Sequence, residues 1–448
     1  MKKISYISVL LLFALIGAVA QSPVVAPAQK KSILLIGGTI HTGTGEVIRD
    51  GAILFEGGKI KQVGAASATG TDKSKYEVID VSGKHVYPGL IFPSTSVGLS
   101  EIGSGVDVAS DVREIGDLNP NVRSIAAYNT DSHVIPVLRS NGILLAQIVP
   151  QGTLLPGTSS IVQFDAWNWE DASYKTDNGI HLVWPRKSAA AGRGGFSQPA
   201  ATSSTTYERN VEAIDKIFSD AVAYNAITKP EKVNLRLESL KGLFDGSKIL
   251  FISATEAKGI IAAVTFGKKY GVQNMVLTGA DETAWAVKDF LKENDIPVII
   301  SNSLSLPKYD YSDIRMPFKL AALFKAEGIL AGLSYTSQAY GNLPFAAGQT
   351  VAYGLSREEA LQTITINNAR ILGIDDRTGT LEPGKDANII VSTGDILDMA
   401  GNNVELAFIT GRSISLDNKH KLLYRRFQTK YDNMKQDALL KQPSGVDK

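Results

Sequence analysis

The sequence of 448 residues contains no cysteine and only five histidines. Without cysteine, the chain can form no disulfide, offer no thiolate to a metal ion and carry no thiol-linked lipid. The histidines are far apart in the sequence, and no two stand at the short spacing that is typical of metal-ligand pairs. They are His41, His85, His133, His181 and His420. These absences exclude a thiolate site and give no support to a histidine site.

The chain also lacks an excess of charge of either sign. Its 46 Lys and Arg residues almost balance its 45 Asp and Glu residues, and the net charge is +1. A balanced charge gives no electrostatic reason to expect a nucleic-acid or membrane-surface partner. We therefore predict no nucleic-acid partner and, once the N-terminal signal described next is removed, no membrane span.

The N-terminus has the pattern of a secretory signal peptide. Lys2 and Lys3 precede an apolar run over residues 7–19, and Ala18-Val19-Ala20 offers a cleavage site of the small-x-small type. The run is too short to cross a bilayer comfortably. We expect residues 1–20 to be removed and the mature protein to be secreted or periplasmic.

The pattern of apolar and polar residues in the remaining chain changes twice. Short apolar runs separated by glycine turns over 32–87 predict one part of a small β domain. Strand-like and helix-like patterns alternate over 88–375, as in an α/β protein with a (β/α)8 TIM-like barrel. Residues 376–424 are β-like again, which predicts a composite β-sandwich domain formed by both ends. Residues 425–448 form a polar tail, and 186–206, rich in Ala, Gly and Ser, interrupts the barrel.

Three segments carry a resemblance to a known family. They are Ile33–Thr39 with the strands that lead to Pro88-Gly89-Leu90-Ile91, then 353–373 with Asn367-Asn368-Ala369, and then Gly379–Asn388. In order and spacing the sequence resembles the amidohydrolase superfamily, particularly its imidazolonepropionase-like branch. The resemblance implies a barrel that hydrolyses non-peptide carbon–nitrogen bonds with a metal at the C-terminal face.

This sequence departs from the family at each position where the resemblance implies a metal ligand. The family has a His-x-His pair after the first barrel strand, a His after the fifth, a His after the sixth and an Asp after the eighth. The residues here are Ser94, Ser96, Ser253, Thr278 and Tyr335. Neutral hydroxyls are poor ligands for zinc and similar ions. We therefore expect no metal and no other cofactor, and we regard these five positions as vestigial ligand positions at the barrel mouth.

Four further residues are candidates for the pocket. Glu101, Glu256 and Asp281 follow strand ends, where a buried carboxylate could act as a general base. For Glu256 and Asp281, an acid at a helix N-terminus is the competing interpretation. Gly157 belongs to a segment over 151–160 that either lines the pocket or simply connects two strands. A serine nucleophile has no support, because no base or oxyanion hole is evident.

Three functions remain open. The first is a metal-free protein with this fold that either binds a small molecule or is one subunit of a complex with another protein. The second is an active hydrolase of cyclic amides, imides or small peptides that uses a rearranged site. The third is a structural pseudoenzyme, as a homo-oligomer or in a complex with an active amidohydrolase homologue.

Overall fold

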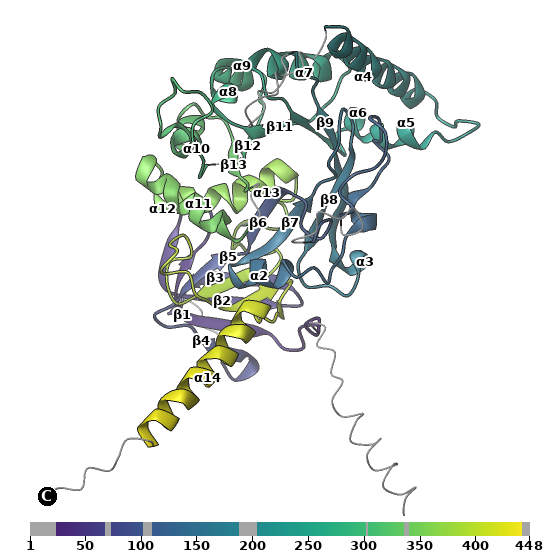
Figure 1. Cartoon of the computed structure of the whole chain (residues 1–448). Coiled ribbons are helices and arrows are strands. Elements are labelled where there is room, and N and C mark those ends of the chain that lie inside the picture. The colour runs from purple at the N-terminus through teal and green to yellow at the C-terminus, as the bar shows by residue number, and fades with distance from the viewer. Residues whose placement is uncertain are drawn as a thin grey trace, which may run out of the picture.

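The computed structural model describes residues 24–67, 73–101, 110–187, 204–301, 303–335 and 340–440. These residues form two β-sheets, and Figure 1 shows the N- and C-terminal sheet below the larger sheet. The predicted signal peptide and most of the predicted interruption over 186–206 lie outside the described residues.

The first sheet combines strands from both ends of the chain. Its order is β16-β15-β14-β5-β1-β2-β3, with β4 beside β1. The central pair joins the two ends, because Pro88 of β5 lies opposite Ile389 of β14 in an antiparallel ladder. This confirms the composite β domain. The strands are β1 (Ile33–His41), β2 (Val47–Glu56), β3 (Lys59–Ala65), β4 (Glu77–Asp80), β5 (His85–Pro88), β14 (Ile389–Ser392), β15 (Val404–Ile409) and β16 (Arg412–Ser413).

The second sheet is the predicted barrel, and its eight strands run in chain order from β6 to β13. Its apolar residues are buried on both faces, one set packing inside the barrel and the other against the outer helices. The strands are β6 (Leu90–Thr95), β7 (Ile143–Ile148), β8 (Gly157–Gln163), β9 (Ser173–Val183), β10 (Ile249–Ser253), β11 (Met275–Ala280), β12 (Val298–Ile300) and β13 (Ala331–Leu333).

One strand departs from a regular barrel. β8 is antiparallel to both β7 and β9, whereas the other neighbouring pairs are parallel. The segment 149–156 between β7 and β8 is too short for the helical crossover that two parallel strands require, so the chain turns back. The fold class is as expected, but this strand order contains a local meander.

The barrel is closed at its seam by side chains. β6 and β13 are the two ends of the sheet. Asn368, in α13 (Ile366–Leu372), donates from Nδ2 to the Ile91 oxygen at 2.8 Å and to the Leu333 oxygen at 3.0 Å. A Cβ atom at Gly332 would lie 2.0 Å from Asn368 Oδ1, so glycine leaves room for this amide. Ser334 Oγ also donates to the Pro93 oxygen of β6 at 2.5 Å, so Asn368 and Ser334 together take the place of ladder hydrogen bonds between the two edge strands.

A carboxylate joins the β domain to the barrel. Asp386 is buried and accepts from Tyr174 Oη at 2.5 Å, from Arg377 Nη2 at 3.1 Å and from Lys59 Nζ at 2.6 Å. Tyr174 belongs to β9 of the barrel and Lys59 to β3 of the terminal sheet. This ion cluster fixes the relative position of the two sheets.

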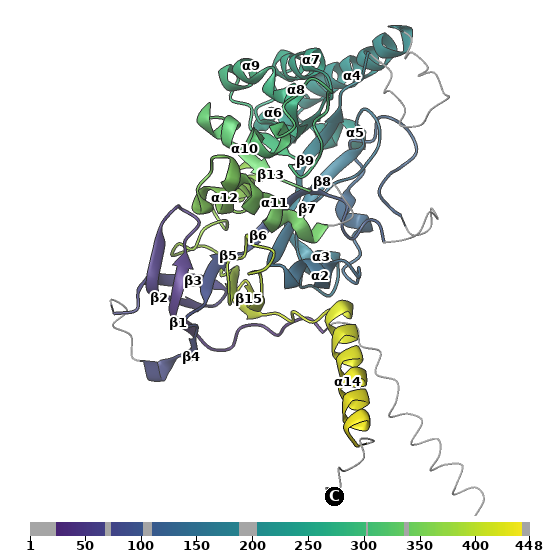
Figure 2. The ribbon, with the colours of Figure 1, turned by 60° about the vertical axis from the view of Figure 1, so that its left-hand side comes forward.

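Helices flank the larger sheet, as Figure 2 shows from a second direction. They are α2 (Ile135–Ser140), α3 (Trp169–Ala172), α4 (Ser204–Asn225), α5 (Leu235–Leu240), α6 (Gly242–Asp245), α7 (Ala257–Lys269), α8 (Glu282–Trp285), α9 (Lys288–Glu293), α10 (Met316–Ala326), α11 (Leu343–Thr350), α12 (Arg357–Thr363) and α13. Ser356 and Glu359 form a capping box at α12. The last helix, α14 (Lys419–Leu440), projects away from the body in both views.

Within the part of the chain that the structure describes, none of these helices combines the length and the apolar character needed to cross a lipid bilayer.

Candidate functional site

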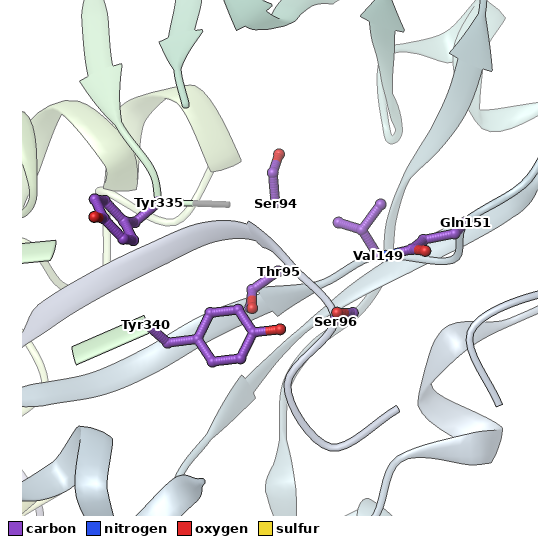
Figure 3. Close-up of a pocket in the computed structure, with 7 residues that line it drawn as sticks. All are labelled: Ser94, Thr95, Ser96, Val149, Gln151, Tyr335 and Tyr340. Carbon is purple, nitrogen blue, oxygen red and sulfur yellow. The ribbon is translucent and has the colours of Figure 1, made fainter. Parts of the chain in front are cut away.

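A small cavity lies at the barrel mouth, where β6, β7 and β13 end. It has a volume of about 180 Å³, and Figure 3 shows the side chains around it, with Tyr335 and Gln151 on opposite sides of the view. Three of the five positions where the resemblance implies a metal ligand, Ser94, Ser96 and Tyr335, are thus brought together. The described lining consists of Ser94, Thr95, Ser96, Val149, Gln151, Tyr335 and Tyr340.

Ser94 is the most unusual residue of this lining. Its φ angle of 53° lies in the left-handed region, which is costly for a residue with a Cβ atom. Its hydroxyl is buried and makes no hydrogen bond to any described residue. A buried polar atom without a partner is unfavourable by about 1–3 kcal/mol. Strain and an unsatisfied hydroxyl at one residue mark this position as a candidate for function.

A chain of buried polar side chains runs from Ser94 into the barrel. The Ser94 backbone nitrogen donates to Gln147 Oε1 at 3.2 Å, and Gln147 Nε2 donates to Ser159 Oγ at 3.0 Å. Ser159 Oγ in turn donates to Asn178 Oδ1 at 2.9 Å, whereas Asn178 Nδ2 has no partner among the described residues. The network is uncharged throughout, so it can orient a polar group by hydrogen bonds but supplies no charge.

The other two of these five positions lie together on neighbouring strands. Ser253 of β10 and Thr278 of β11 are register partners in a parallel ladder, near the ends of both strands. Thr278 Oγ1 donates to the Ile252 oxygen at 3.1 Å, so this hydroxyl is used within the sheet. Neither residue belongs to the described lining of the mouth cavity. The five positions therefore form two groups in the structure.

These residues do not fit a metal ion. The five positions offer three serine hydroxyls, one threonine hydroxyl and one phenol, and Zn²⁺ and related ions prefer imidazole, thiolate or carboxylate ligands. Elsewhere in the described residues, no group of three or more His, Asp or Glu side chains is arranged to hold one. The donor chemistry of the site therefore supports binding of a neutral group and not of a cation.

The structure gives two of the further candidates structural contacts. Glu101 accepts hydrogen bonds from Asn129 Nδ2 and Ser132 Oγ, both at 3.2 Å. Gly157 begins β8 with a φ angle of 149°, and a Cβ there would lie 2.5 Å from the Val122 oxygen. Gly157 is thus required for close packing of two backbones, and it is not in the described lining of the mouth cavity.

The two remaining acids lie at helix N-termini. Asp281 caps α8 by accepting from the Thr283 nitrogen at 2.8 Å, and it also pairs with Lys308 at 2.8 Å. Glu256 occupies the N-cap position of α7 and accepts from the Lys187 nitrogen at 3.4 Å. The Asp281 contact agrees with the competing interpretation, since an acid stabilises the positive end of a helix dipole, whereas the Glu256 side chain makes no capping hydrogen bond to α7.

His181 was not predicted as a site residue. This residue lies in β9, only 6% exposed, and its ring stacks on Phe251 with 5.0 Å between centroids. Burial lowers the pKa of His181 to about 3, and its Nε2 has no partner in the described part of the chain. Ile180 and Leu182 lie on either side of His181, and this alternation of apolar and polar residues is typical of a strand. The alternation was the available signal for the position of His181. At neutral pH it is an uncharged side chain inside the barrel wall.

Comparison with known proteins places the resemblance mainly in the C-terminal part. Residues 317–414 match the model of the amidohydrolase family. A segment of 51 residues is 47% identical to imidazolonepropionase from Picrophilus torridus, and this match covers 11% of the present chain and 13% of the relative. The match to this curated relative therefore spans about one eighth of its length.

Solved structures extend the similarity of fold to most of the chain. An amidohydrolase from Thermotoga maritima MSB8 superposes with a TM-score of 0.73 at 22% identity, over 86% of this chain and 99% of that one. Molinate hydrolase gives a TM-score of 0.52 at 15% identity, over 86% and 95% of the two chains. Phenylurea hydrolase B gives 0.53 at 14% identity, over 86% and 97%. At such identities, the structures share the fold.

Proposed function

Because the chain has the amidohydrolase fold and its residues 317–414 match the amidohydrolase family, we propose that it is a divergent member that acts by binding, without metal-dependent hydrolysis. The observation that carries the proposal is the set of neutral side chains at the five vestigial ligand positions. Metal-dependent hydrolysis needs a cation that lowers the pKa of a bound water, and these side chains are poor ligands for one.

The small volume of the mouth cavity favours a role as one subunit of a complex with another protein. Its volume of about 180 Å³ is below the roughly 300–1,000 Å³ that is usual for pockets that hold drug-sized ligands. A molecule of a few heavy atoms would fit, and it would be held by hydroxyl and amide groups. A second copy or an active homologue is the partner that the shared fold suggests. We also propose that the protein is exported, on the strength of the signal pattern over residues 1–20.

The competing function is hydrolysis of carbon–nitrogen bonds through a rearranged site. It is favoured by the unpartnered hydroxyl of Ser94 and by the hydrolase names of several proteins with the same fold. A serine nucleophile requires a neighbouring base. No base hydrogen-bonds this hydroxyl among the described residues. The geometry therefore favours the binding role.

The test is an assay of cyclic amides, imides and dipeptides with and without added Zn²⁺ or Mn²⁺. We expect no turnover above the buffer rate. Turnover that a chelator abolishes would establish a metal site, and turnover that resists chelators but is lost in Ser94→Ala would establish the rearranged site. Either result would overturn the proposal.

A second arm restores the five ligands together, as Ser94→His, Ser96→His, Ser253→His, Thr278→His and Tyr335→Asp. Barrel strand ends are rigid, so we expect this variant to take up metal. Activity should stay near background, because each imidazole also needs a partner that fixes its tautomer, and the water needs a base. Turnover far above background would show that the site differs from an active one only at these five positions.

A further inference from the structure

The C-terminal helix α14 carries an exposed row of apolar side chains. Leu423, Tyr424, Phe427, Tyr431 and Met434 are between 38% and 68% exposed. Their spacing of three and four residues puts them on one face of a helix, since an α-helix has 3.6 residues per turn. We call these five residues the α14 stripe. Leu422, which is 48% exposed, is adjacent in sequence but points to the opposite side of the helix.

The described part of α14 is also strongly cationic. Residues 419–440 contain six Lys or Arg side chains and two Asp, so this helix alone carries a net charge of +4 within a chain of net charge +1. At 100° per residue, Lys430 borders the stripe next to Leu423, and Lys435 borders it next to Tyr424. An apolar face with a lysine along each edge is the arrangement of helices that lie on membrane surfaces, where the long side chains reach the head groups.

The helix is held by the body at one end only. Asn418 Nδ2 donates to Ser140 Oγ at 3.1 Å, and Asn418 Oδ1 accepts from the Lys421 nitrogen at 2.9 Å. Leu416, just before the helix, packs against the main core. Beyond this anchor α14 projects from the molecule in both views. The stripe is therefore accessible along its described length.

Charge decides between two occupants of the stripe. The same spacing would suit a pair of helices from two copies of this chain. In a parallel pair, however, Lys430 of one copy faces Lys435 of the other, and in an antiparallel pair each lysine faces its own equivalent. Like charges at these flanking positions oppose pairing. An anionic bilayer surface attracts both lysines and accepts the apolar side chains.

We propose that α14 docks the protein on the surface of an anionic lipid bilayer. The α14 stripe inserts between head groups, while Lys430 and Lys435 contact the lipid phosphates. The helix lies in the plane of the surface and does not cross the bilayer. This role is independent of whether the barrel hydrolyses any substrate.

Co-sedimentation with vesicles tests the proposal. The processed chain beginning at Gln21 retains every described element and lacks the apolar run over 7–19. We expect it to bind vesicles of phosphatidylcholine with about 30% phosphatidylglycerol, and to bind pure phosphatidylcholine at least about tenfold more weakly. Salt of about 0.5 M should weaken binding to the anionic vesicles, because it screens the lysines.

Two pairs of variants separate the stripe from general charge. Phe427→Ser with Tyr431→Ser should lower the partition coefficient by about tenfold or more, since two large apolar side chains no longer insert. Leu423→Ser should weaken binding measurably, whereas the matched control Leu422→Ser should not. Unchanged thermal unfolding of the body would verify that these exposed substitutions leave the fold intact.

Several results would contradict the proposal that α14 docks on an anionic bilayer. Equal binding to neutral and anionic vesicles, no binding to either, or equal losses in Leu422→Ser and Leu423→Ser would each overturn the proposal. So would a dimer in solution that Phe427→Ser with Tyr431→Ser dissociates, because the stripe would then be covered by a second copy.

Discussion

Two regions differ in how their polar groups are used: the barrel mouth, and the segment over 364–388 that contains Asn368 and Asp386. We call this segment the junction, because it joins the edge strands of the barrel to each other and the barrel to the β domain. At the junction, Asn368 Nδ2 bridges two edge strands and Asp386 accepts from three side chains, although Asn368 Oδ1 has no partner in the described residues. At the mouth, the Ser94 hydroxyl has no partner in the described residues and the polar network is neutral. The residues that carry the family resemblance thus hold the fold together, and the family's chemistry depends on other residues. A shared fold does not establish a shared reaction.

The comparison predicts its largest effect at the junction. Asp386→Ala should destabilise the protein by about 3 kcal/mol, because it removes a buried carboxylate and leaves the buried Tyr174 hydroxyl without its partner, whereas Arg377 and Lys59 are partly exposed to water. Chemical denaturation measures the free energy of unfolding. Ser96→Ala at the mouth is the control, with an expected change below about 1 kcal/mol. Equal effects would remove the distinction between the two regions.

The barrel seam gives the next largest effect. Asn368→Ala should cost about 2–3 kcal/mol, since it leaves two strand carbonyls unpaired inside the protein. The neighbouring Asn367 makes one bond, to the Ala331 oxygen at 2.9 Å, and it is less buried. Asn367→Ala should therefore cost about 1 kcal/mol. If the order were reversed in denaturation experiments, Asn368 would not close the seam.

A third prediction concerns His181 and the pH dependence of the free energy of unfolding. Burial lowers the pKa of its folded form to about 3, whereas an unfolded histidine titrates near its usual 6.5. The unfolded state therefore binds the extra proton first, and the stabilising contribution, complete above pH 6.5, is lost as the pH falls towards 3. The slope for this one group approaches about 1.4 kcal/mol per pH unit.

Unfolding curves recorded across this range check the effect. His181→Gln should remove that part of the pH dependence, and the exposed His133→Gln should leave it unchanged. An unaltered slope in His181→Gln would mean that this ring is not buried and neutral.

The smallest predicted effect has the opposite sign. Ser94→Gly should stabilise the protein by about 1 kcal/mol, because glycine adopts a φ angle of 53° without strain and removes an unpaired buried hydroxyl. Ser96→Gly, at a residue without a positive φ angle, should destabilise slightly. A marked loss of stability in Ser94→Gly, seen as a lower melting temperature, would show that the hydroxyl has a structural partner.

Much of the framework was predictable from the sequence. Glycine-separated runs indicated the two halves of the terminal sheet, and Ser356 with Glu359 marked the start of α12. The apolar run of β8 does not itself indicate the direction of the strand, because it has the same pattern in parallel and antiparallel pairs; the short connection over 149–156 was the available signal. The position of His181 in a strand was predictable, because the apolar residues Ile180 and Leu182 flank it. The cationic character of α14 was hidden in the composition, because its net charge of +4 is balanced by acidic residues elsewhere in the chain.

The central claim, that the family's fold persists here without its metal chemistry, is tested most directly by elemental analysis of the purified protein. Ser94, Ser96, Ser253 and Thr278 are the positions where the resemblance to the amidohydrolase superfamily implies histidines. We predict no stoichiometric Zn, Fe, Mn or Ni after dialysis. About one metal ion per chain that survives dialysis would contradict the account, because hydroxyl groups are too weak as ligands to retain it.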